Sequence, residues 1–161
     1  MRDVCKLPED EKLWRIGRGF VVRDLPRTEA ELRRIPPFEF ENWAVIAIGG
    51  IGNKAKVGDM GLDGRIFPVG TMPQAQANAF DFMDQWYPVQ VKQKDKAGRP
   101  DIDQFEAAMI RAKRQKGFFV SFDYTRDALD EIRRFGQSEN RHIVPLTVHE
   151  ILEGEIAYKL V

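Results

Sequence analysis

Short apolar segments alternate with amphipathic segments of helical length through the second half of the chain, and this alternation constrains the fold more than any other feature. Each segment has the length and periodicity of a strand or a helix. The expected order is a strand at 87–93, a helix from Asp101 to Gly117, the strand "FFVSF", the helix "TRDALDEIRRF", the strand "HIVPLT" and the helical tail "VHEILEGEIAYKL". Strands separated by helices predict a mixed or parallel central sheet with helices on both faces, joined by right-handed crossovers. The sequence therefore indicates an α/β fold.

The first half of the chain carries weaker signals. Residues 1–35 are charged and are expected to form a lead-in or linker with one short helix, whereas residues 36–161 are expected to form a single domain. The segment "PFEFENWAVIAI" predicts a helix at about 37–48, because its apolar residues recur at helical spacing. The glycine-rich "GGIGNKAKVGDMGLDG" leads into the short strand "RIFPV", and residues 70–80 are expected to form an exposed loop or lid.

Composition excludes several classes of protein. The chain has 161 residues, of which 43% are hydrophobic and 31% charged, as in an ordinary globular domain. No apolar run is long enough to span a membrane and the N-terminus lacks a signal-peptide pattern, so a cytoplasmic location is expected. A single cysteine, Cys5, excludes an internal disulfide and a thiolate-cluster metal site. The two histidines lie in no recognised zinc or nucleophile motif, and we interpret them as structural.

Two polar side chains, Gln90 and Lys92, interrupt the strand expected at 87–93. Side chains two residues apart on a strand point to the same face, so Val89 and Val91 face the core while the polar pair faces a cleft. A buried lysine without a partner costs several kcal/mol or loses its proton, so a carboxylate is expected nearby. The leading candidate is Asp63, which precedes the strand "RIFPV" in the glycine-rich segment.

An aspartate just before one strand and a Gln-x-Lys sequence on the next suit the binding of a metal ion beside a phosphate. The oxygen atoms of Asp63 and Gln90 are hard ligands that suit Mg²⁺, and a lysine cation can lie beside a reacting phosphate. Phosphodiester hydrolysis needs these groups, because charge develops on the phosphoryl oxygens in the transition state. The alternative interpretation is a structural ion pair between Asp63 and Lys92.

Four segments, in this order, resemble the Mrr-like restriction endonuclease branch of the PD-(D/E)xK nuclease superfamily. They are "PPFEFENWAVIAIGG", "KVGDMGLDGRI", "YPVQVKQKDK" and "GFFVSFDYTRDAL", which contain Phe40-Glu41, Gly58 to Gly64, Gln90 to Lys92 and Ser121. The resemblance covers about residues 36–135. The chain is also similar to the nuclease-like C-terminal region of some bacterial DNA methylases. The resemblance implies a restriction-endonuclease-like fold, with a mixed central sheet flanked by helices on both faces.

The resemblance also implies roles for individual residues. Asp63 corresponds to the principal metal ligand, Gln90 takes the place of the usual acidic ligand, and Val91 offers its backbone carbonyl. Lys92 corresponds to the catalytic lysine. Glu41 corresponds to the acidic residue on the family's preceding helix.

Two other acids could be confused with these site residues. Glu39 lies two positions before Glu41, and the sequence alone does not separate the two; both could equally be solvated helix residues. Pro100-Asp101 imitates the literal PD of the superfamily name, but it follows the lysine. We interpret Asp101 as a helix cap.

The resemblance implies a Mg²⁺-dependent DNA endonuclease of a restriction or restriction-modification system, in which Mn²⁺ can substitute for Mg²⁺. Double-stranded DNA is the expected partner, with a fused or associated DNA methylase as a further one, and double-strand cleavage favours a homodimer. Eight Lys or Arg residues against four acids lie between residues 90 and 116, and we expect Lys94, Lys96 and Arg99 to contact phosphates. One alternative is a non-cleaving DNA-binding or interaction module with the same fold. A small-ligand α/β domain is a more distant one, because no phosphate-binding glycine motif is present.

Overall fold

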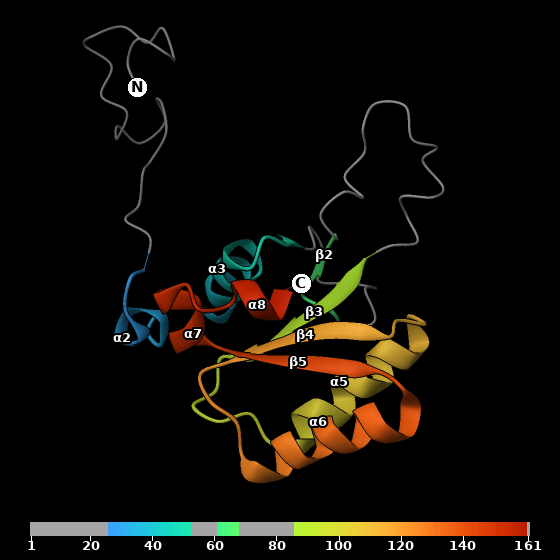
Figure 1. Cartoon of the computed structure of the whole chain (residues 1–161). Helices are drawn as coiled ribbons and strands as arrows, with labels where there is room; N and C mark the ends of the chain where they lie inside the picture. Colours follow the sequence, from blue (N-terminus) through green and yellow to red (C-terminus); the bar gives the residue numbers. More distant parts are fainter. Residues whose placement is uncertain (1–25, 53–60, 68–85, 161) are drawn as a thin grey trace, which may run out of the picture.

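The computed structural model describes residues 26–52, 61–67 and 86–160, which contain a five-stranded mixed sheet (Figure 1). The strands lie in the order β1-β2-β3-β4-β5. Their bounds are Ile51–Gly52, Gly64–Ile66, Tyr87–Val91, Lys116–Ser121 and His142–Thr147. The first three strands pair in antiparallel fashion, whereas β3, β4 and β5 run parallel to one another. The predicted mixed sheet is therefore confirmed, with β3 at its centre.

Helices cover both faces of this sheet, as the alternation of segments predicts. Helices α5 and α6 lie side by side on one face, and α3 lies on the opposite side with α7 and α8 (Figure 1). Their bounds are Pro37–Ala47 for α3, Arg99–Arg111 for α5, Arg126–Glu139 for α6, Val148–Glu153 for α7 and Ala157–Leu160 for α8. A short helix, α2, spans Glu29–Leu32. None of the helices in these ranges is long and apolar enough to cross a membrane.

The sheet separates two hydrophobic cores, and β3 contributes to both sides. Val89 and Val91 belong to the core beneath α3, together with the fully buried Phe40. Gln90 pairs in register with Phe119, which belongs to the core beneath α5 and α6. The alternation expected for a strand therefore directs Gln90 to the face opposite the two valines.

Helix boundaries follow local capping chemistry. Thr125 caps α6 by accepting a hydrogen bond from the Ala128 amide at 3.2 Å. Helix α5 begins at Arg99, two residues before the expected start at Asp101. The Asp101 carboxylate nevertheless binds the first turn, because it accepts a hydrogen bond from the Gly98 amide at 3.0 Å. Asp101 therefore stabilises the start of α5 from the third position of the helix, whereas Gly98 occupies the N-cap position.

The structure differs from the sequence expectations at several other boundaries. The strand expected at 87–93 ends at Val91, and the two-residue strand β1 was not predicted. A strand this short shows no periodicity. In the lead-in, Leu32 of α2 is fully buried in the core beneath α3. The expected loop or lid at 70–80 lies outside the described residues.

Candidate active site

Asp63 lies directly against β3. It comes just before β2, and its backbone amide donates a hydrogen bond to the Val89 carbonyl at 2.9 Å. Its carboxylate oxygen Oδ2 accepts a hydrogen bond from the Val91 amide at 2.7 Å. The β2–β3 register pairs Gly64 with Val89, so one further step places Asp63 opposite Gln90. The structure therefore brings together residues that the sequence separates by β2 and the long segment between β2 and β3.

Gly64 allows this close approach. A Cβ atom built there would lie 2.6 Å from Cγ1 of Val45 on α3 and 3.1 Å from the Ile51 carbonyl oxygen. Contacts this short cannot be relieved by rotating a flexible side chain, because Val45 is β-branched and packed in a helix. The absence of a side chain at Gly64 therefore lets α3 pack closely against β2, the strand that directly follows Asp63.

Gln90 carries an unsatisfied buried acceptor. Its side chain is 6% exposed, and its Oε1 atom has no hydrogen-bond partner among the described residues. Leaving a buried acceptor unsatisfied costs about 1–3 kcal/mol, so a native structure usually has a reason for one. The amide oxygen and the Asp63 carboxylate opposite it are both hard oxygen ligands. These two residues therefore fit a divalent cation such as Mg²⁺.

Lys92 follows β3 and is anchored through its backbone amide, which donates to the Val120 carbonyl at 2.9 Å. Its charge acts on Asp101, a buried carboxylate at the start of α5. Burial alone raises the pKa of Asp101, but the hydrogen bonds from Lys94 and the Gly98 amide and the charges of Lys94 and Lys92 outweigh it and lower that pKa. Asp101 therefore stays ionised and balances the lysines at this strand end.

The three residues expected to contact DNA phosphates all take part in ion pairs. Lys94 lies 2.7 Å from Asp101, and Lys96 lies 3.5 Å from Asp123. Arg99 lies 3.2 Å from Glu131, whose side chain is 3% exposed. The side chains of all three cations are more than half exposed, but the partners of Lys94 and Arg99 are buried carboxylates, whereas the partner of Lys96 is exposed.

The two candidate acids of α3 differ in their surroundings. Glu39 is exposed and Glu41 is half-buried. Between them, Phe40 is fully buried and stacks on Phe122, with ring centroids 5.2 Å apart. Glu41 precedes Val45 by one helical turn, so it shares the helix face that packs against Gly64.

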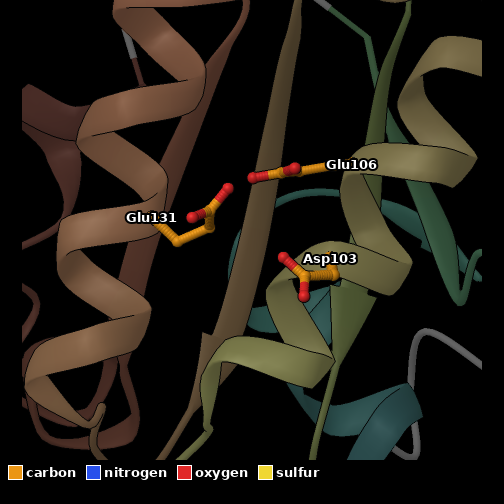
Figure 2. Close-up of side chains that lie close together, drawn as sticks. All are labelled: Asp103, Glu106 and Glu131. Atoms are coloured by element: carbon orange, nitrogen blue, oxygen red, sulfur yellow. The ribbon is translucent and has the colours of Figure 1, made fainter.

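A second group of acids lies between α5 and α6, and the sequence reasoning missed it. The carboxylates of Asp103, Glu106 and Glu131 converge there, with ligand atoms within 4.8 Å of one another (Figure 2). The i, i+3 spacing of the first two is visible in the sequence. Their meeting with Glu131 depends on how the two helices pair, which the sequence pattern does not specify.

This acidic cluster is already charge-compensated. Glu131 accepts hydrogen bonds from both Nε and an Nη of Arg134, and it also pairs with Arg99. Burial, followed by the charges of Glu131 and Asp103, raises the pKa of Glu106 to about 7. A proton on Glu106 therefore leaves two carboxylates and two guanidinium groups, which balance. With that proton, the cluster needs no metal ion to balance its charge.

Comparison with known proteins identifies the family of the chain. The family model Mrr_cat, described as a restriction endonuclease, matches residues 32–149, which is most of the chain. No curated protein and no solved structure matches. The match spans α3, the whole described sheet and both helices α5 and α6. The predicted resemblance is therefore confirmed, and the chain belongs to the Mrr-type restriction endonuclease family, with the α/β fold of a restriction-type nuclease.

Proposed function

We propose that this protein is a Mg²⁺-dependent endonuclease that hydrolyses phosphodiester bonds of double-stranded DNA. One observation carries the proposal: the Asp63 carboxylate binds the Val91 amide, opposite a Gln90 side chain whose buried oxygen lacks a partner among the described residues. Lys92 directly follows the strand that carries Gln90. Two oxygen ligands and a lysine at one strand end are the groups that this hydrolysis requires.

Asp63 and Gln90 would hold the ion through their side chains, and Val91 would add its backbone carbonyl. Mn²⁺ would substitute for Mg²⁺, because it accepts the same oxygen ligands. When bound, the ion neutralises charge on a phosphoryl oxygen and makes a water molecule more acidic. The chain itself supplies the rigid frame, because the Val91 amide binds the Asp63 carboxylate and the Asp63 amide binds the Val89 carbonyl, which together fix Asp63 against β3.

Lys92 would orient the attacking water or stabilise the negative charge that develops on the phosphate. The ionised carboxylate of Asp101 lies close enough to interact with the charge of Lys92. Glu41 would act beside Asp63 from the helix face that contacts Gly64.

Lys94 and Lys96 would bind DNA phosphates near the site. Lys96 pairs with the exposed Asp123, and exposed ion pairs contribute only about 0–1 kcal/mol, so a phosphate can compete for this cation. Lys94 is held more firmly because its partner Asp101 is buried, but more than half of the Lys94 side chain is exposed. Arg99 would contribute less to DNA binding, because buried Glu131 holds it against α6. Binding through such contacts weakens steeply as salt rises.

A restriction or restriction-modification system is the proposed context, with a DNA methylase as a fused or associated partner. Double-strand cleavage would be achieved by a homodimer with one site on each strand. A cytoplasmic location stays a prediction that follows from the substrate.

The second candidate function is a module that binds DNA without cutting it. The observation that favours it is Gln90, because a neutral amide binds Mg²⁺ less strongly than a carboxylate would and leaves the site one negative charge short. Under this alternative the protein would bind duplex DNA in a salt-sensitive way, with no cleavage in any divalent metal.

The test is cleavage of methylated and unmethylated plasmids with Mg²⁺ or with EDTA. We expect cleavage only with the metal, and a loss on the order of 10²-fold or more in Asp63→Ala and Lys92→Ala. Asp127→Ala, an exposed acid on α6, is the matched control and should cut normally. Melting temperatures establish that each variant folds. Normal cutting by both site variants would contradict the site, and salt-sensitive binding without cleavage by the wild type would establish the binding module.

A further inference from the structure

The side chain of Gln93 connects the strand end of Lys92 to helix α2. Its amide nitrogen donates hydrogen bonds to the Leu32 carbonyl at 2.8 Å and to the Ile35 carbonyl at 2.9 Å. An amide nitrogen has two N–H donors, so one binds the last residue of α2 and the other binds Ile35, three residues beyond the helix. The final carbonyls of a helix have no partner within the helix, and Leu32 offers one that α2 leaves available.

The residue that directly follows α2 contacts the same region. Arg33 forms an ion pair with Asp95, and its guanidinium lies 3.9 Å from the centroid of the Phe122 ring. The ion pair is exposed on both sides, at 39% for Arg33 and 88% for Asp95, so it contributes little by itself. The two hydrogen bonds of the half-buried Gln93 are therefore the stronger polar link between α2 and this segment.

The sheet holds the same segment from its other side. The Ser121 hydroxyl donates to the Lys94 carbonyl at 3.1 Å, and the Phe122 amide donates to that carbonyl at 3.3 Å. The Lys92 amide is bound to Val120 of β4. The backbone that carries Lys92 is thus fixed between β4 and α2, and Gln93 makes the contact on the α2 side.

We infer that Gln93 is a positioning residue for Lys92 and that α2 forms part of the catalytic domain; this inference rests on the proposed function. A long lysine side chain amplifies small shifts of its own backbone. A misplacement of about 1 Å at a catalytic group can lower the rate by about 10²-fold. Gln93 acts on the reaction only through the backbone of its neighbour.

The test compares Gln93→Ala and Gln93→Glu with the wild type. Glutamate is nearly isosteric but replaces both donors by an oxygen that faces two carbonyl oxygens, so Gln93→Glu should disturb the link at least as much as alanine does. Gln137→Ala, an exposed glutamine on α6, is the matched control. Two measurements are made: amide hydrogen exchange of the metal-free protein, and kcat and KM for plasmid cleavage.

We expect exchange to rise together in residues 28–35 and 92–97 of the Gln93 variants, by roughly tenfold for the loss of two hydrogen bonds. We expect kcat to fall by about tenfold or more and KM to change less than kcat, because Lys92 acts on the chemical step whereas the flexible side chains of Lys94 and Lys96 can still reach DNA phosphates. Neither quantity should change in Gln137→Ala.

Unchanged exchange in residues 92–97 would overturn the inference, and so would a normal kcat or a rise in KM alone. A lower melting temperature with normal kcat would show a purely structural role. If the wild type never cleaves DNA, the proposed function fails and the positioning role fails with it. The exchange measurement then still decides whether α2 and the strand end are coupled, so the two failures are distinguishable.

Discussion

At the scale of the residue, Gln90 is the most informative position in the chain. Its oxygen is buried, unpaired among the described residues and opposite Asp63 across the β2–β3 register. The sequence alone indicated that Gln90 and Lys92 share a face, because strand geometry requires it. It could not indicate that the Val91 amide binds Asp63, since the two residues are joined through the long segment between β2 and β3.

Changing Gln90 to glutamate should strengthen metal binding. The variant Gln90→Glu adds a carboxylate opposite Asp63, and a gain of about 1.4 kcal/mol would raise Mg²⁺ affinity roughly tenfold. Without metal, the two carboxylates repel each other and the melting temperature should fall. Calorimetric titration with Mg²⁺ and melting curves in EDTA measure both effects.

The control for that experiment is Gln104→Glu, an exposed position on α5 with the same change in charge. It should leave the Mg²⁺ affinity unchanged. Equal affinities for wild type and Gln90→Glu would show that Gln90 is not a ligand and serves only the fold.

The two acids of α3 provide a matched pair of variants. Glu41→Gln should raise the Mg²⁺ concentration needed for half-maximal cleavage by roughly tenfold, as expected for a residue that supports a metal ligand. Glu39→Gln should change it little, because Glu39 is exposed and lies off the helix face of Val45. Metal titrations of the cleavage rate compare them, and the reverse order would transfer the role to Glu39.

At the scale of the element, α5 and α6 are joined by a group of charges whose balance depends on a proton. Glu106 is buried on α5 and faces Glu131 on α6 (Figure 2). Arg99 and Arg134 both pair with Glu131. Sequence reasoning located both helices but not this contact, because an amphipathic pattern does not specify which residues of two helices meet.

The raised pKa of Glu106 predicts a pH-dependent stability. Its pKa rises from 4.5 to about 7 on folding, so the folded state keeps a proton that the unfolded chain releases. This contribution is fully present below pH 4.5 and is lost as pH rises toward 7. The variant Glu106→Gln, which carries no charge, should therefore be more stable than wild type at pH 8 and similar to it near pH 5.

Denaturant unfolding at several pH values measures this difference. Glu139→Gln, an exposed acid near the end of α6, is the control and should follow the wild type at every pH. A constant difference between Glu106→Gln and wild type from pH 5 to pH 8 would show that Glu106 does not titrate in this range.

At the scale of the whole molecule, the two halves of the sheet differ in how far the sequence predicts them. In the parallel half from β3 to β5, the prediction for β5 agrees with the structure residue by residue, because apolar runs alternate there with capped helices. The antiparallel half was predicted only at β2, because β1 has two residues and its pairing depends on Gly52 meeting Gly64. The candidate site lies where these halves join. Its residues could therefore be predicted from the sequence, whereas the contacts between them could be seen only in the structure.

The close approach at Gly64 bears on how large sets of variants should be interpreted. Asp63 and Gly64 are adjacent, and substitution of either would eliminate activity, but through different causes. A side chain at position 64 collides with Val45 and with backbone, so its variants would be lost through low abundance of folded protein. Variants of Asp63 would remain abundant and inactive. A mutational scan scored by activity alone would not distinguish variants of Asp63 from variants of Gly64. A scan that also measures the abundance of folded protein would separate loss of catalysis from loss of folding.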